Sequence, residues 1–324
     1  MIRPAGKTSI IHAGEQLRKG NLVTFPTETV YGLGADATSD KAVARIFQAK
    51  ERPSFNPLII HIPSLPLAEE IVEFTETARH LADVFWPGPL TLVMKRSPNS
   101  RISLLATAGL ETIAVRIPAQ ATAQAILISA GIPIAAPSAN PSGKISPTRA
   151  EHVLNSLGDR AGLIIDDGPC NVGLESTVLD CSGPKPNILR VGGTTIEQIE
   201  AAIGSVNINT HSTDTPSAPG MLRSHYAPRA KLRLDVSGVE DHESLLSFGQ
   251  HKIKNITREK NLSPSADLEE AAANLFSMIH ILDQSSNHVA VMPIPDSGLG
   301  RAINDRLRRA ATPDIASLPR CPND

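Results

Sequence analysis

Short β-rich runs that alternate with helical runs limit the fold of this 324-residue sequence more than any other feature. Residues 21–27 (NLVTFPT) predict a strand, and residues 40–50 predict a helix capped by Ser39 or Asp40. Residues 67–85 predict another helix. Such interleaving predicts an α/β domain built on a large mixed sheet, and the many prolines favour irregular connections over a regular barrel. The later strand-like runs, bounded by Pro or Gly, are PLIIHI, PLTLVMK, ETIAVRIP, GIPIAAPSA, GLIIDDG, STVLDC and NILRVGG.

The chain changes character near residue 207. Residues 207–229 are rich in Ser, Thr, Pro and Gly, which predicts an interdomain linker, although the stretch SAPGMLRSHYAP is too specific for a plain spacer. The run KLRLDV then opens a second α/β unit, followed by an amphipathic helix (DLEEAAANLFSMIHILDQ) and a strand–turn–helix segment. We predict a catalytic domain over 1–206, a linker or lid over 207–230, and a second, smaller α/β domain over 231–324.

Composition excludes several classes of protein. Aromatic residues make up 3% of the chain and its net charge is −2, which argues against a dedicated nucleic-acid surface but leaves a local basic patch open. The three cysteines (Cys170, Cys181 and Cys321) form no CxxC pair, so a disulfide framework or zinc site is not expected. The first residues lack an apolar signal core and no apolar stretch is long enough to span a bilayer. A cytoplasmic protein with reduced thiols is expected.

The loop KERPSFNPL, residues 50–58, combines cations with two prolines. A rigid cationic loop suits phosphate or carboxylate, because proline lowers the cost of holding charges in place. In an extended segment Lys50 and Arg52 would point the same way and clamp one anion. The plain alternative is a solvated helix end with Lys50 at the negative end of the dipole. The prolines and Asn56 favour the functional interpretation.

The segment FPTETVYGLGADA, residues 25–37, follows the first predicted strand. Its glycines fit a loose dinucleotide fingerprint, but no acidic strand end follows at the expected distance. A plain tight turn would place Gly32 and Gly34 at positive φ. Three hydroxyls and a carboxylate before the glycines (Thr27, Glu28, Thr29 and Tyr31) indicate instead a segment that lines a ligand.

Other polar residues sit inside apolar strands or turn-rich loops. Arg116 pairs with an acid or meets an anionic ligand, because charges are rarely buried alone. His61, taken by itself, is interpreted as a core histidine. The loop PSANPSGKISPT, residues 137–148, is not a Walker A loop, and it is either a phosphate cradle or plain surface. Neither a Ser/His/Asp set nor a metal cluster stands out, so the chemistry expected is direct displacement aided by positioning and charge.

Taken together, these segments resemble the threonylcarbamoyl-AMP synthase family, which has the YrdC-like fold. The resemblance covers most of residues 10–200, and the C-terminal third resembles the Rossmann-like domain of the family's long form. The motifs that carry it are FPTETVYGLG, KERPSFNPLIIH, WPGPLTLV, TIAVRIP, PSANPSGKISPT, ESTVLD and LRVGG, with SAPGMLRSHYAP and GLGRAINDRLRRAA further along.

The resemblance implies that L-threonine, bicarbonate and ATP are joined to give threonylcarbamoyl-adenylate and pyrophosphate. The product would pass to a transferase that modifies tRNA. Mg²⁺ would be held mainly by ATP phosphates and water, and Lys50 and Arg52 would be the catalytic cations. Tyr226 would reach back over the nucleotide. The ATP contacts implied are Arg52, Asn56, Thr112, Ser138, Ser146, Arg190 and Tyr226. The threonine contacts implied are Thr29, His61, Arg116, Ala136 (by its backbone) and Ser176.

Two other functions compete with this one. An RNA-binding module would hold tRNA or double-stranded RNA on a basic face, but the near-neutral charge and few aromatics disfavour it. Weak tRNA or double-stranded RNA binding by the synthase remains open. Carbamoyl transfer in hydrogenase maturation uses a related domain, but it also needs acylphosphatase and zinc-finger segments that this sequence does not contain.

Overall fold

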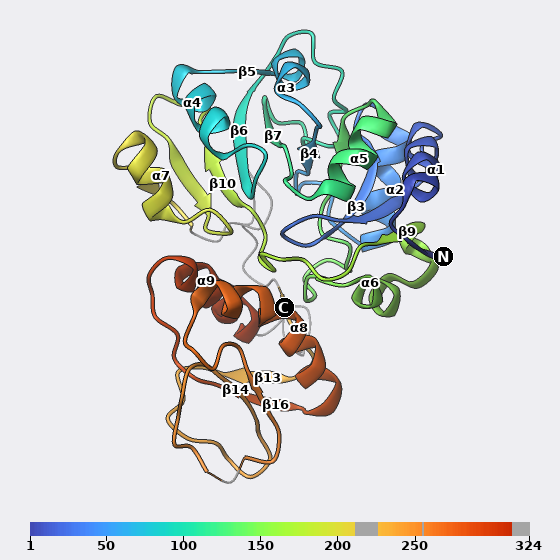
Figure 1. The fold of residues 1–324 in the computed structure, drawn as a ribbon. Helices are drawn as coiled ribbons and strands as arrows, with labels where there is room; N and C mark the ends of the chain where they lie inside the picture. The colour runs from blue at the N-terminus through green and yellow to red at the C-terminus, as the bar shows by residue number, and fades with distance from the viewer. Residues whose placement is uncertain (211–225, 255, 313–324) are drawn as a thin grey trace, which may run out of the picture.

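The structure is a computed structural model, and it describes residues 1–210, 226–254 and 256–312. Two sheets organise these residues, with helices packed around each (Figure 1). None of the helices in the described ranges is both long enough and apolar enough to cross a membrane.

The first sheet has twelve strands, eleven of them in the order β1-β9-β2-β3-β8-β4-β7-β6-β10-β11-β12, with β5 paired to β6. Parallel pairs such as β4–β7 and β6–β10 alternate with antiparallel pairs such as β2–β3 and β6–β7. This confirms the predicted large mixed sheet. Its strands are β1 (Ile2–Pro4), β2 (Val23–Pro26), β3 (Tyr31–Asp36), β4 (Ile59–His61), β5 (Val72–Glu73), β6 (Leu90–Arg96), β7 (Thr112–Arg116), β8 (Ile134–Ala135), β9 (Leu163–Asp166), β10 (Thr177–Asp180), β11 (Asn187–Arg190) and β12 (Asn207–Ile208).

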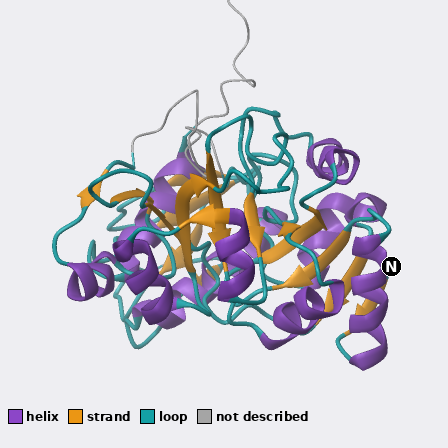
Figure 2. Cartoon of the chain, turned by 90° about the horizontal axis from the view of Figure 1, so that it is seen from above, coloured by secondary structure: helices purple, strands orange, loops and turns teal. Residues whose placement is uncertain are grey.

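Helices flank the strands of this sheet, as the turned view in Figure 2 shows. They are α1 (Lys7–Arg18), α2 (Asp40–Lys50), α3 (Leu65–Ile71), α4 (Glu76–Phe85), α5 (Ala121–Ala130), α6 (Ala150–Leu157), the 3₁₀ turn η1 (Gly158–Ala161) and α7 (Ile196–Ile203). Helix α2 forms as its sequence predicts: the Ser39 hydroxyl accepts from the Ala42 N–H, and Val43 and Ile46 face the core.

The single helix predicted over residues 67–85 is wrong. Helix α3 ends at Ile71, and Val72 then pairs with Arg96 of β6 as the two-residue strand β5. A new helix starts where the Thr75 hydroxyl accepts from the Ala78 N–H. The reason is local: β-branched Val72 suits a strand, and Thr75 is a stronger cap than an interior helix residue.

The second sheet is smaller and wholly parallel, in the order β13-β16-β14-β15. Its elements are β13 (Lys231–Arg233), β14 (Ser244–Ser247), β15 (Glu259–Asn261), α8 (Leu268–Ser285), β16 (His288–Val291) and α9 (Leu299–Ala311). The predicted second α/β domain is therefore present. Strand β12 extends the first sheet to residue 208, and residues 211–225 of the predicted linker lie outside the described ranges.

The two domains share a buried apolar cluster. Val30, Ile145 and Leu174 of the first domain pack with residues of the second, among them Phe276 of α8. At Gly173 the backbone adopts φ +70° and comes so close to α8 that an added Cβ would lie 2.5 Å from the Cα of Ala273. Contacts this tight place the loop before β10 directly against the second domain.

Candidate active site

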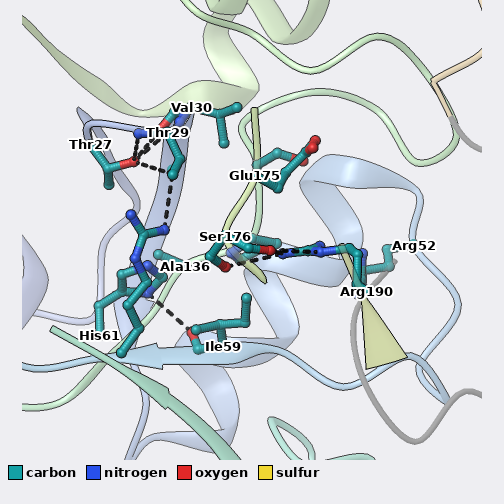
Figure 3. A pocket seen from close by; sticks show the side chains of 14 residues that line it. Thr27, Thr29, Val30, Arg52, Ile59, His61, Ala136, Glu175, Ser176 and Arg190 are labelled. Carbon is teal, nitrogen blue, oxygen red and sulfur yellow. Dashed lines mark hydrogen bonds between the residues drawn. The ribbon is translucent and has the colours of Figure 1, made fainter. Parts of the chain in front are cut away.

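A pocket opens among the strand ends of the first domain (Figure 3). Residues far apart in the sequence meet there because neighbouring strands of the mixed sheet end at the same place. The lining residues are Thr27, Thr29, Val30, Gly32, Arg52, Ile59, His61, Arg116, Ala136, Pro137, Ser138, Glu175, Ser176 and Arg190.

Arg116 occupies one side of the pocket, where its guanidinium donates to three acceptors. These are Glu28 Oε1 at 2.6 Å, Thr29 Oγ1 at 2.9 Å and the Gly88 carbonyl at 3.1 Å. Burial favours the protonated form of Glu28, but the charge and hydrogen bonds of Arg116 hold its pKa below the ordinary value. Arg116 therefore pairs with an acid, as the first sequence alternative expects, and it also lines the pocket; contact with an anionic ligand stays a prediction.

His61, at the end of β4, lies beside Arg116 and lines the same pocket. Burial and the Arg116 charge lower its pKa to about 3, so the imidazole is neutral at pH 7. Its Nδ1 lies 3.3 Å from the Ile59 carbonyl, which only accepts, so Nδ1 carries the proton. The other nitrogen, Nε2, is then an acceptor for an N–H or O–H of a ligand.

The depressed pKa of His61 has a measurable consequence. Between pH 6.5 and about 3, the unfolded chain binds a proton at His61 that the folded chain does not. The free energy of unfolding should therefore fall as the pH drops below 6.5, by about 2 kcal/mol at pH 5 from this residue. Urea titrations at pH 7.5 and 5.0 measure this loss. It should shrink in His61→Gln and persist in His80→Gln, which replaces an exposed histidine. An equal loss in both variants would contradict the prediction.

Two more guanidinium groups lie at the other side of the pocket. Arg52 donates to the carbonyls of Asn56 at 3.2 Å and Pro57 at 2.9 Å. Arg190, at the end of β11, donates to the Ser176 carbonyl at 2.9 Å and to its hydroxyl at 3.1 Å. Burial and the charge of Arg190 lower the pKa of Arg52 to about 9. Within the described ranges no carboxylate lies within ion-pair distance of Arg52. Such an arrangement favours an anionic ligand.

Lys50 does not join Arg52 in an anion clamp, so that prediction is wrong. Lys50 is the last residue of α2, and Glu51 then takes the left-handed conformation with φ 53°. The Lys50 side chain turns into the protein and donates to the carbonyls of Ser138 (2.6 Å) and Asn140. Burial and Arg52 lower its pKa well below the ordinary value. Lys50 thus holds the loop that carries Ser138, beneath the pocket.

The two glycines after β2, Gly32 and Gly34, are not in a turn. Gly32 and Gly34 lie within β3, and neither has the positive φ that a tight turn would need. An added Cβ at Gly34 would lie 2.7 Å from the Phe25 ring, and one at Gly32 would lie 3.3 Å from the Ala136 Cβ. Close packing explains these glycines, and the dinucleotide fingerprint is a chance match. Of the four polar residues predicted to line a ligand, Thr27 and Thr29 lie in the pocket wall. Glu28 instead accepts from Arg116, and the Tyr31 hydroxyl donates to the Gly168 carbonyl at 2.7 Å.

The structure brings eight of the predicted site residues into the pocket wall: Thr29, Arg52, His61, Arg116, Ala136, Ser138, Ser176 and Arg190. Ser146 lies just behind it and donates to Glu175 Oε1 at 2.6 Å. Asn56 is fully buried in the loop that Arg52 holds. Thr112 stands at the far end of β7 from Arg116 and is paired with Lys95.

Tyr226 is buried and stacks on Phe276 at a ring distance of 5.4 Å. Burial raises its pKa to about 12. Its ring lies 5.3 Å from the guanidinium of Arg306, which donates to Glu175 of the pocket wall. Sequence reasoning gave no site role to five lining residues, Val30, Gly32, Ile59, Pro137 and Glu175. Val30, Ile59 and Pro137 look like ordinary strand or loop residues, whereas Glu175, an acid before a buried strand, was a usable signal.

A magnesium site built from protein side chains is not seen in residues 1–210, 226–254 and 256–312, where no three His, Cys, Asp or Glu side chains gather. The carboxylates beside the pocket are already engaged, Glu28 by Arg116 and Glu175 by Ser146 and Arg306. This donor set fits Mg²⁺ that keeps phosphate oxygens and water as its ligands.

Comparison with known protein families identifies the family of this two-domain chain. Residues 15–192 match the family model Sua5_yciO_yrdC, described as "Telomere recombination", and residues 194–312 match "Threonylcarbamoyl-AMP synthase, C-terminal domain". The chain therefore belongs to the Sua5 family, with a YrdC domain followed by a Sua5 C-terminal domain. The predicted family and fold class are confirmed.

Individual relatives agree. The chain is 42% identical over 321 residues to the threonylcarbamoyl-AMP synthase of Bacillus subtilis, covering 93% of this chain and 92% of the relative. A crystal structure of Pyrococcus abyssi Sua5 complexed with L-threonine is 39% identical, with a TM-score of 0.88, and covers 96% of this chain and 97% of that one. A shorter relative from Mycobacterium tuberculosis, a putative threonylcarbamoyl-AMP synthase, is 36% identical over 60% of this chain and 89% of its own length.

Proposed function

We propose that the pocket of Figure 3 is where this protein joins L-threonine, bicarbonate and ATP into threonylcarbamoyl-adenylate, with release of pyrophosphate. The enzyme class predicted from the sequence, synthesis of threonylcarbamoyl-AMP from threonine, is confirmed by the family and by relatives that cover nearly the whole chain. One observation carries the assignment of the site. His61 on one side of a single pocket faces Arg52 and Arg190 on the other (Figure 3), and Arg116 and Ser138 line the same pocket.

Threonine would bind at the Arg116 side. Three of the five N–H donors of Arg116 have acceptors among the described residues, and the other two suit the threonine carboxylate. Neutral His61 would accept an N–H or O–H of the amino acid at Nε2. A P. abyssi relative was solved with L-threonine bound, which supports this use of the pocket.

ATP would lie toward Arg52, Ser138 and Arg190, with its triphosphate against the two guanidinium groups. The threonine amine and bicarbonate form a carbamate with loss of water. A carbamate oxygen then attacks the α-phosphorus, an O–P bond forms, and the bond to pyrophosphate breaks. Arg52 and Arg190 would stabilise the charge on the transferring and leaving phosphates. Mg²⁺ bound to the phosphates would neutralise part of that charge.

Pyrophosphate release assayed with ATP, bicarbonate and one amino acid at a time tests this function. Release should require threonine and bicarbonate together, and Ser, Val or Ala should support little of it. Pyrophosphate release that does not depend on threonine would refute the proposal. We further propose that the product passes to a tRNA-modifying transferase and that the enzyme acts in the cytoplasm. Binding of tRNA or double-stranded RNA by this chain stays a prediction.

A further inference from the structure

Arg306 of α9, in the second domain, contacts a charged residue of the pocket wall. Arg306 is 1% exposed, and its Nε donates to Glu175 Oε2 at 2.9 Å. Glu175 lines the pocket from the loop that packs on α8, and its other oxygen accepts from Ser146 Oγ at 2.6 Å. Arg306 also donates to Asp305 at 2.7 Å and lies 5.3 Å from the centre of the Tyr226 ring. A buried cation of one domain therefore meets a carboxylate in the active-site wall of the other.

Glu175 is an unexpected residue for a pocket that takes a triphosphate. It shares the wall with Arg190, and its negative charge acts on that guanidinium. A buried carboxylate repels phosphate strongly, because charges interact over longer distances where water is excluded. If Arg306 did not offset its charge, Glu175 would repel the nucleotide more strongly or draw Arg190 away from it. The contact with Arg306 removes this conflict.

We propose that Arg306 is a positioning residue for the adenylation reaction: it neutralises Glu175 and thereby keeps Arg190 and Arg52 available to the phosphates of ATP. The second domain thus completes the electrostatics of the nucleotide site without touching the nucleotide. This inference rests on the proposed function of the pocket. The alternative role for the Arg306–Glu175 pair is to hold the two domains together.

Titration calorimetry of the full chain with Mg²⁺–ATP, in the absence of threonine, separates the two roles. Arg306→Met should weaken ATP binding about tenfold or more, because the buried Glu175 carboxylate loses the neutralising charge of Arg306. The double variant Arg306→Met, Glu175→Gln removes both charges and keeps the volume. It should bind ATP within about threefold of the wild type, since the two substitutions are coupled.

Arg301 provides a matched control on the same helix. It also bridges the domains, through Glu197 of α7 at 2.8 Å, but both side chains are substantially exposed and neither lines the pocket. Arg301→Met should leave ATP binding unchanged. Threonine binding should change less than ATP binding in Arg306→Met, because Arg116 lies on the other side of the pocket.

Two results would overturn the inference: wild-type ATP affinity in Arg306→Met, or a double variant as weak as the single one. The second would show a structural pair. Both differ from failure of the proposed function, in which the wild-type protein itself would make no threonylcarbamoyl-AMP.

Discussion

Replacing Arg116 by Met is expected to abolish threonine-dependent pyrophosphate release and to lower the free energy of unfolding by about 3–5 kcal/mol. The Arg116 and Glu28 side chains are only 3% and 10% exposed, so the substitution leaves a carboxylate buried without its cation. The same substitution removes the donors assigned to the threonine carboxylate. Steady-state kinetics with threonine varied and urea unfolding measure the two effects separately.

The double variant Arg116→Met, Glu28→Gln separates the effect on stability from the effect on threonine use. It should recover most of the lost stability, because no buried charge is left unpaired, while threonine use stays lost. Arg79 serves as a control for ion pairs in general. Its partner Glu69 is 51% exposed, and breaking that pair should cost less than about 1 kcal/mol. A wild-type KM for threonine in Arg116→Met would mean that the threonine site lies elsewhere.

Replacing Arg52 by Met should lower activity strongly but have little effect on the free energy of unfolding. We expect kcat/KM for ATP to fall by about 2–4 kcal/mol of transition-state stabilisation, or roughly 30- to 1000-fold. Stability should hold or rise, because Arg52 is a half-buried cation close to Arg190, and its pKa is lowered to about 9 by desolvation and by that charge. Loss of the two hydrogen bonds from Arg52 to the carbonyls of Asn56 and Pro57 should offset part of this gain in stability.

Arg45→Met is the matched control for Arg52. Arg45 lies on α2 and also donates to a backbone carbonyl, that of Gly20 at 2.6 Å, but it does not line the pocket. Its replacement should leave ATP kinetics unchanged. Unchanged ATP kinetics in Arg52→Met would show that the nucleotide site is misplaced, and a large loss of stability would show that Arg52 is chiefly structural.

Much of the fold follows from local signals in the sequence. The sequence predicts α2 from its Ser39 cap and its apolar face, which is buried in the structure. It predicts α8 from the cap residue Asp267, whose side chain accepts from the Glu270 N–H at 2.7 Å. The break between α3 and α4 was missed because the helical pattern is continuous there, while the pairing of Val72 with Arg96 depends on a strand further along the chain.

The site was harder to predict than the fold. Resemblance to a family supplied His61, which by itself looks like a core residue, and geometry now gives it a neutral ring in the pocket wall. Local reasoning failed at Lys50, because the left-handed Glu51 turns the chain between the two cations. It also had no means of pairing Glu175 with Arg306, which is 131 residues away. Such contacts are set by how the domains pack, and no local pattern encodes them.

The apolar seam between the domains bears on how such proteins change length during evolution. Val30, Ile145 and Leu174 would meet water in a chain that stopped after the first sheet. Losing the second domain from this lineage would therefore demand polar replacements at those three positions as well as a new counterion for Glu175. The two domains are linked by an ion pair at the pocket as well as by apolar packing. We therefore expect the sequences of the two domains to vary together.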